Sequence, residues 1–208
     1  MIVQRKISEI SNKLKNIYEH FPMVQFIPFS NELKILLDQG LSYRDYFICN
    51  KLCSFFSEAE KCDKKILNEL QSFGDELIGE KIFYFIDNCE SSKKSRFIAF
   101  LLNAIKSEDD DVNFKITVDE YLLLSFNLSK IYFGNLELFL NKKQDVYYTS
   151  NDALEECVVT SLYNAGLLEH LGLSAGFTNL EKPCGDVFKI SKLGELVLHY
   201  LSQFEQLE

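Results

Sequence analysis

The chain has no tryptophan, and glycine, proline and histidine are scarce, with 9, 3 and 3 residues in 208. So few glycines disfavour the Gly-rich loops that cradle nucleotide phosphates. No apolar run approaches the roughly 20 residues that cross a bilayer, and the N-terminus lacks the apolar block of a secretory signal. We therefore expect a cytoplasmic protein that does not associate with membranes.

Motifs of the common enzyme classes are also missing. The chain contains no G-x-S-x-G elbow, no H-E-x-x-H and no phosphate-binding loop. The acidic pairs Asp75–Glu76 and Glu155–Glu156 fit better as helix N-terminal charges, which favour the helix dipole, than as acid/base couples. The sequence thus predicts a protein that is not an enzyme and needs no cofactor.

The 6 cysteines do not form the paired Cys/His spacing of a zinc site or the framework of a small disulfide scaffold. Cys49 and Cys53 lie one helical turn apart, and together with Cys62 they offer three thiolates to a metal. The same residues also fit a core of small apolar side chains. We favour the core interpretation and expect free thiols.

Up to about residue 140 the apolar residues recur at three- and four-residue steps, which predicts a bundle of about seven helices. One of these predicted helices covers Phe97 to Ile105, and a longer one covers Tyr121 to Leu140. We place a boundary after residue 143 and assign residues 1–143 to the helical bundle.

Residues 144–208 show a different pattern. Asp152 is suited to begin a helix that Gly166 ends. Two short strands are predicted next, Leu173 to Leu180 and Val187 to Ser191, followed by a strongly amphipathic last helix. The fold class we predict is mainly α, a multi-helix bundle followed by a small module with a β-hairpin, and we expect the module to pack against the bundle.

Two segments resemble known families. The phrase LYNAGLLEHLG followed by VFKISKLGELVLHYL is similar to the end of winged-helix proteins, in which a Gly-Leu-Leu step ends a helix, a β wing follows, and a Leu-Gly pair opens the terminal helix. The region from Ser95 to Leu140 looks like the helical region of uncharacterised small bacterial and mobile-element proteins that end in such a module. The resemblance implies a winged-helix-like module in residues 144–208 and implies no known activity.

The predicted helix before the hairpin has the wrong charge for reading DNA. Such a helix normally presents Lys or Arg to the phosphates, but Asp152 to Ala165 contains neither. Residues 144–208 carry three lysines against ten acidic residues, a net charge of −7 within the total of −9. We therefore predict a module that binds a protein partner and not nucleic acid, through the outward side chains Glu155, Glu156, Thr160, Tyr163 and Asn164.

Three cations, Lys93, Lys94 and Arg96, form the most basic local cluster, at the start of a predicted helix. They oppose the helix dipole, and they fit either a solvated helix start or a contact with an acidic surface. An alternative function, a winged-helix transcriptional regulator, requires a homodimer that joins these cations into one basic strip. A second alternative is an acidic DNA mimic that inhibits a nucleic-acid enzyme. For the protein-binding function, a bacterial or phage factor in host–mobile-element conflict is the context that we expect.

The stretch DDDVNFKITVDE, residues 109–120, resembles an EF-hand calcium loop. The family's sixth loop position is Gly, whereas this chain has Phe114, and a bulky residue at positive φ is costly. The competing interpretation is a solvated acidic loop followed by a capping box from Thr117 to Glu120, and we favour it over calcium binding. The residues that would supply calcium ligands are Asp109, Asp111, Asn113, Lys115 and Glu120.

Overall fold

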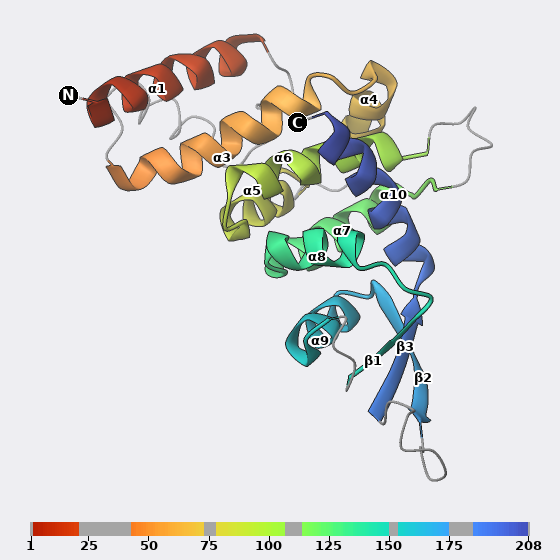
Figure 1. Cartoon of the computed structure of the whole chain (residues 1–208). Coiled ribbons are helices and arrows are strands. Elements are labelled where there is room, and N and C mark those ends of the chain that lie inside the picture. Colours follow the sequence, from red (N-terminus) through yellow and green to blue (C-terminus); the bar gives the residue numbers. More distant parts are fainter. Residues whose placement is uncertain are drawn as a thin grey trace. The chain divides into compact units, whose positions relative to one another are not determined.

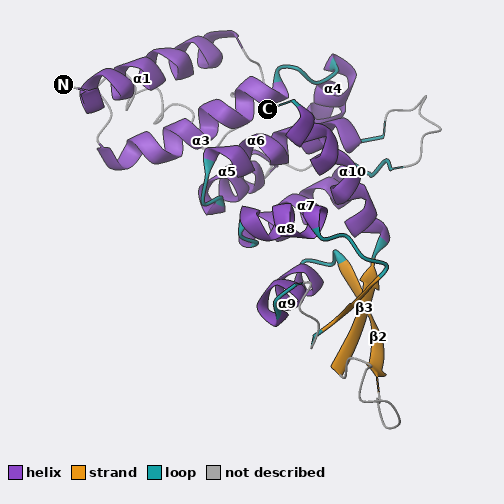
Figure 2. Cartoon of the chain, in the orientation of Figure 1, coloured by secondary structure: helices purple, strands orange, loops and turns teal. Residues whose placement is uncertain are grey.

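The computed structural model describes residues 2–20, 43–72, 78–106, 114–149, 154–174 and 185–207, and these residues are mainly helical (Figure 2). A small three-stranded antiparallel sheet accompanies the helices. The predicted mainly α fold class is therefore confirmed. None of the helices in these ranges combines the length and the apolarity that crossing a membrane requires.

The contacts within the chain define two compact units, an N-terminal unit (Met1–Ser129) and a C-terminal unit (Lys130–Glu208). The division precedes the helix at residues 133–141, whereas the boundary drawn from the sequence follows it. In chain order the first helices are α1 (Ile2–His20), α3 (Tyr43–Ala59), α4 (Lys64–Ser72), α5 (Ile78–Asn88), α6 (Ser92–Phe100), the short 3₁₀ helix η2 (Leu101–Ala104) and α7 (Val118–Lys130) (Figure 1). The remaining elements are α8 (Phe133–Asn141), β1 (Val146–Tyr148), α9 (Glu156–Asn164), β2 (Leu168–Ser174), β3 (Gly185–Ile190) and α10 (Lys192–Gln206).

Helix α3 lies at the centre of the N-terminal unit, in contact with α1, α5 and α6 (Figure 1). A helix with neighbours on several sides must bury apolar side chains on more than one narrow stripe of its surface. Accordingly Leu52 and Phe55 are buried in addition to Cys49, Cys53 and Phe56. The cysteines therefore pack as small apolar core residues, as we expected, and the structure holds them as free thiols.

Two of the predicted helices have different bounds in the structure. The segment from Tyr121 to Leu140 contains two helices, because Tyr132 leaves the helical conformation (φ −64°, ψ 129°) and precedes α8. The segment from Phe97 to Ile105 contains the end of α6 and the 3₁₀ helix η2. The prediction of two continuous helices was wrong, since no Pro or C-terminal Gly marks either change in the sequence.

The C-terminal unit contains the predicted order of helix, hairpin and helix. Its strands have the order β1-β3-β2, so that β3 is the central strand and pairs with both neighbours in antiparallel fashion. The prediction missed β1, started α9 four residues early at Asp152, and placed the first strand of the hairpin five residues late at Leu173.

Two local motifs determine where α9 ends and where α10 begins. Gly166 has a φ of +77°, its N–H donates to Tyr163 O, and the Leu167 N–H donates to Leu162 O, which is the Schellman arrangement. Ser191 is the N-cap of α10, since its Oγ accepts from the Gly194 N–H at 2.9 Å. The Ser191 Oγ also donates to Gly166 O at 2.6 Å, and this bond links the two motifs.

Candidate functional site

The side chains predicted to meet a partner lie together on the outer face of α9. Glu156, Thr160, Tyr163 and Asn164 are exposed at helical spacing, while Val159 and Leu162 are fully buried on the opposite side. Glu155 is the exposed N-cap residue of the same helix. The structure thus brings all five predicted residues onto one surface.

Tyr163 belongs to an aromatic cluster that connects α9 to the hairpin. Its ring lies 5.2 Å from the ring of Phe188 on β3 and 6.3 Å from the ring of His170 on β2, measured between centroids. The rings of His170 and Phe188 are 5.2 Å apart. Phe188 is buried beneath this cluster, whereas 44% of Tyr163 and part of His170 remain exposed. Aromatic contact of this kind holds the Tyr163 ring in place on the surface.

The hairpin extends this surface with exposed leucines. Leu173 is 77% exposed and pairs with Asp186 across β2 and β3, two residues from Phe188 on β3. Because side chains two residues apart on a strand share a face, Leu173, Asp186 and Phe188 lie on the same side of the hairpin. Leu171 is the extra residue of a β-bulge between His170 and Gly172 and is also exposed.

Three carboxylates belong to the same two elements, α9 and the hairpin. His170 Nε2 and Asp186 Oδ1 are 2.8 Å apart, and this bond orients the imidazole on the surface. Glu155 and Glu156 lie at the start of α9, and α9 carries no Lys or Arg. We call His170, Leu171, Leu173 and Asp186 together with the five α9 residues the α9–hairpin face.

Comparison of the chain with known protein families, with curated proteins and with solved structures gives no match. The α9–hairpin face therefore has to be interpreted from its own geometry. Sequence reasoning found its α9 half and missed its hairpin half. It placed His170 and Leu171 in the connection after the helix, began the first strand only at Leu173, and left Asp186 outside the second strand, which it began at Val187. The sequence did offer one signal for this strand. In FKI two apolar residues alternate with a lysine, so that Phe188 and Ile190 lie on one side of β3.

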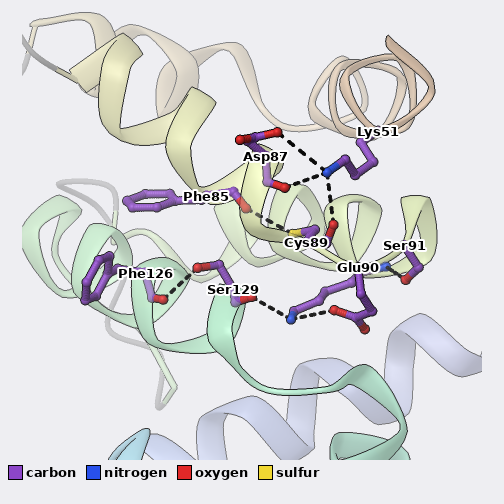
Figure 3. A network of polar contacts seen from close by, with 9 residues as sticks. Lys51, Phe85, Asp87, Cys89, Glu90, Ser91, Phe126 and Ser129 are labelled. Atoms are coloured by element: carbon purple, nitrogen blue, oxygen red, sulfur yellow. Dashed lines mark hydrogen bonds and ion pairs between the residues drawn. The ribbon is translucent and has the colours of Figure 1, made fainter. Parts of the chain in front are cut away.

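The predicted basic cluster does not form a basic surface. Lys94 is 1% exposed, and its Nζ donates to Glu90 Oε2 at 2.7 Å and to Ser129 O at 2.8 Å (Figure 3). Arg96 is half-buried, with its Nε 3.3 Å from an oxygen of the buried Glu58 carboxylate. Lys93 is also half-buried. Neither interpretation of the cluster, a solvated helix start or a contact with an acidic surface, holds for Lys94, because its ammonium group is buried.

The calcium-loop resemblance falls partly on Asp109, Asp111 and Asn113, which lie outside the described residues. Phe114 does adopt the positive φ of the sixth loop position, at 72°. The Lys115 ammonium donates a hydrogen bond to Asn103 O, with Nζ and O 3.0 Å apart. The capping box is present, since Glu120 Oε2 accepts from the Thr117 N–H at 2.8 Å and Thr117 Oγ1 accepts from the Glu120 N–H at 3.2 Å. The described ranges contain no metal-binding group of three or more His, Cys, Asp or Glu residues.

The buried cysteines should be almost inert. Burial raises the pKa of the thiols of Cys49, Cys53, Cys62 and Cys89 from 9.0 to about 12. Since the thiolate is the reactive form and a thiolate of higher pKa is the stronger nucleophile, we expect these thiols to react with a disulfide reagent at about pH 8 roughly 30-fold more slowly than an ordinary thiol. Cys157 is exposed, so that a reagent can reach its thiol, and we expect it to react faster than the buried ones.

The measurement is a thiol titration in a Cys184→Ser background, because Cys184 lies outside the described residues. We expect one fast thiol in the folded protein and five after unfolding in guanidinium. Two or more fast thiols in the folded protein would contradict the burial of these residues.

Proposed function

We infer that the chain is a non-catalytic binding protein that recognises a protein partner through the α9–hairpin face. The observation that carries this proposal is the exposed Tyr163, Leu171 and Leu173 beside the packed Phe188 and His170 rings. Cores of protein–protein interfaces are rich in aromatic residues, and the strongest contributions come from rings that are already held in place. The carboxylates of the same face favour a partner with a basic surface.

The strand order β1-β3-β2, the helix before the hairpin and the helix after it support a winged-helix-like module used for protein binding. DNA reading by α9 is disfavoured, since Glu155 and Glu156 would meet the phosphates with their own negative charge. The free thiols of the described cysteines agree with a reducing compartment, and we propose a cytosolic protein.

The first test compares two charge reversals of matched position. Glu156 and Glu195 are both exposed carboxylates in the first turn of a helix of the C-terminal unit, so that Glu156→Lys and Glu195→Lys change the net charge and the helix-dipole energy equally. Only Glu156 lies on the α9–hairpin face. We expect Glu156→Lys to weaken partner binding at least tenfold and Glu195→Lys to leave it unchanged.

The partner is captured from nuclease-treated host lysate with the tagged protein, purified and titrated by calorimetry. Tyr163→Ala should weaken its binding by about 2 kcal/mol or more, roughly 30-fold, as expected for a central aromatic residue. Competition by duplex DNA for the same partner would favour the DNA-mimic alternative instead. If no stoichiometric partner is captured, or if Tyr163→Ala binds as well as the wild type, the proposal is wrong.

A further inference from the structure

The N-terminal unit contains a pocket of about 560 Å³ between α5 and α7. This volume is within the range of about 300–1,000 Å³ that is typical of pockets for small organic ligands. Its floor is apolar, since Phe85 and Leu122 line it and are both buried. All residues that line the pocket belong to the N-terminal unit, whereas the α9–hairpin face belongs to the C-terminal unit.

The walls of the pocket are aromatic and partly exposed. The rings of Tyr84 and Phe126 stack, with centroids 5.9 Å apart and an interplanar angle of 21°. Phe85 meets Phe126 edge to face, with centroids 6.4 Å apart. Tyr84 is 47% exposed and Leu123, opposite it on α7, is 60% exposed. A flat apolar ligand would remove these side chains from water and offer its own face to the rings.

The polar residues of the pocket determine the charge of the ligand. Glu80 and Asp119 lie in the first turns of α5 and α7, and both line the pocket. Among the described residues neither carboxylate forms an ion pair or a hydrogen bond. Lys81 brings one positive charge, so that the charged side chains lining the pocket carry a net charge of −1.

A helix-dipole argument explains why each helix begins with a carboxylate. It does not explain why both carboxylates line the same pocket as a stacked aromatic pair. Aromatic faces and carboxylates both attract cations, and in this pocket they lie within one cavity. We propose that the pocket binds a small organic cation with a flat apolar body, the ring packing on Tyr84 and Phe126 and the ammonium lying toward Glu80 and Asp119.

Three probes of similar size and different charge test the proposal: benzyltrimethylammonium, benzyl alcohol and benzenesulfonate. Saturation-transfer NMR gives their affinities, and amide shift mapping on the labelled full chain gives their location. We expect the cation to bind with a Kd of roughly 1 mM, as its size allows. The neutral probe should bind about five- to tenfold more weakly and the anion more weakly still.

Two variants separate the charge contribution from the apolar contribution. The double variant Glu80→Gln, Asp119→Asn should remove the preference for the cation and leave the affinity for benzyl alcohol unchanged. Leu123→Ala should weaken both probes several-fold, and its matched control Leu207→Ala, at another exposed leucine, should weaken neither. The proposal is overturned if no probe binds, if the three bind equally, if the shifts lie outside α5 and α7, or if the double variant keeps its preference.

Discussion

Gly194→Ala is expected to destabilise the C-terminal unit more than any exposed substitution. A Cβ at residue 194 would lie 2.1 Å from Leu167 O and 2.9 Å from Ile190 Cγ2. The carbonyl belongs to backbone that cannot rotate away, because Leu167 O also accepts from the Ser191 N–H at 3.0 Å. We expect a cost of about 3 kcal/mol, at the upper end for overpacking, since the first turn of α10 has to move away from Leu167.

Hydrogen exchange read by mass spectrometry measures this effect locally. Amides of β2, β3 and α10 should exchange roughly 100-fold faster in Gly194→Ala, in proportion to the lost free energy, wherever exchange requires opening of the unit. Glu195→Ala changes the neighbouring exposed residue of the same turn and should remain within about 0.5 kcal/mol of the wild type. Equal exchange in the two variants would show that α10 does not approach Leu167 so closely.

The features that sequence reasoning predicted correctly depend on residues within one turn of each other. Gly166 ends α9, where its N–H donates to Tyr163 O. The Thr117 to Glu120 capping box likewise forms between residues three apart. Both motifs are encoded by residue types at fixed spacing, so that a single sequence is enough to recognise them.

The features that were missed depend on partners far away in the sequence. The break between α7 and α8 carries no Pro or C-terminal Gly, and it leaves Ile131 buried. The register of β2 on β3 includes a bulge at Leu171, which the pattern EHLGL does not reveal. His170 and Asp186 come together only through that register, which is why the α9 half of the candidate site was predictable and the hairpin half was not.

The lysines of the N-terminal unit show the same dependence on long-range contacts. Lys94 lies in the first turn of α6, where a cation opposes the helix dipole, but its ammonium donates to Ser129 O near the C-terminal end of α7. Lys51 of α3 similarly donates to Asp87 O and Cys89 O at the C-terminal end of α5 (Figure 3). Each lysine therefore stabilises the end of a helix other than its own, and its role is invisible in the local sequence.

Lys94→Ala should consequently be among the most destabilising substitutions in the N-terminal unit. It deletes a buried stem and leaves Ser129 O without its ammonium donor, for an expected loss of about 3–5 kcal/mol. Lys94→Met keeps most of the stem and should lose about 1–3 kcal/mol, which is the cost of the unsatisfied carbonyl alone. The exposed Lys64, which also opposes the dipole in the first turn of a helix, is the matched control, and Lys64→Ala should be neutral or slightly stabilising. Urea unfolding followed by circular dichroism ranks the three variants, and a Lys94→Ala protein as stable as Lys64→Ala would show that the buried ammonium does not support α7.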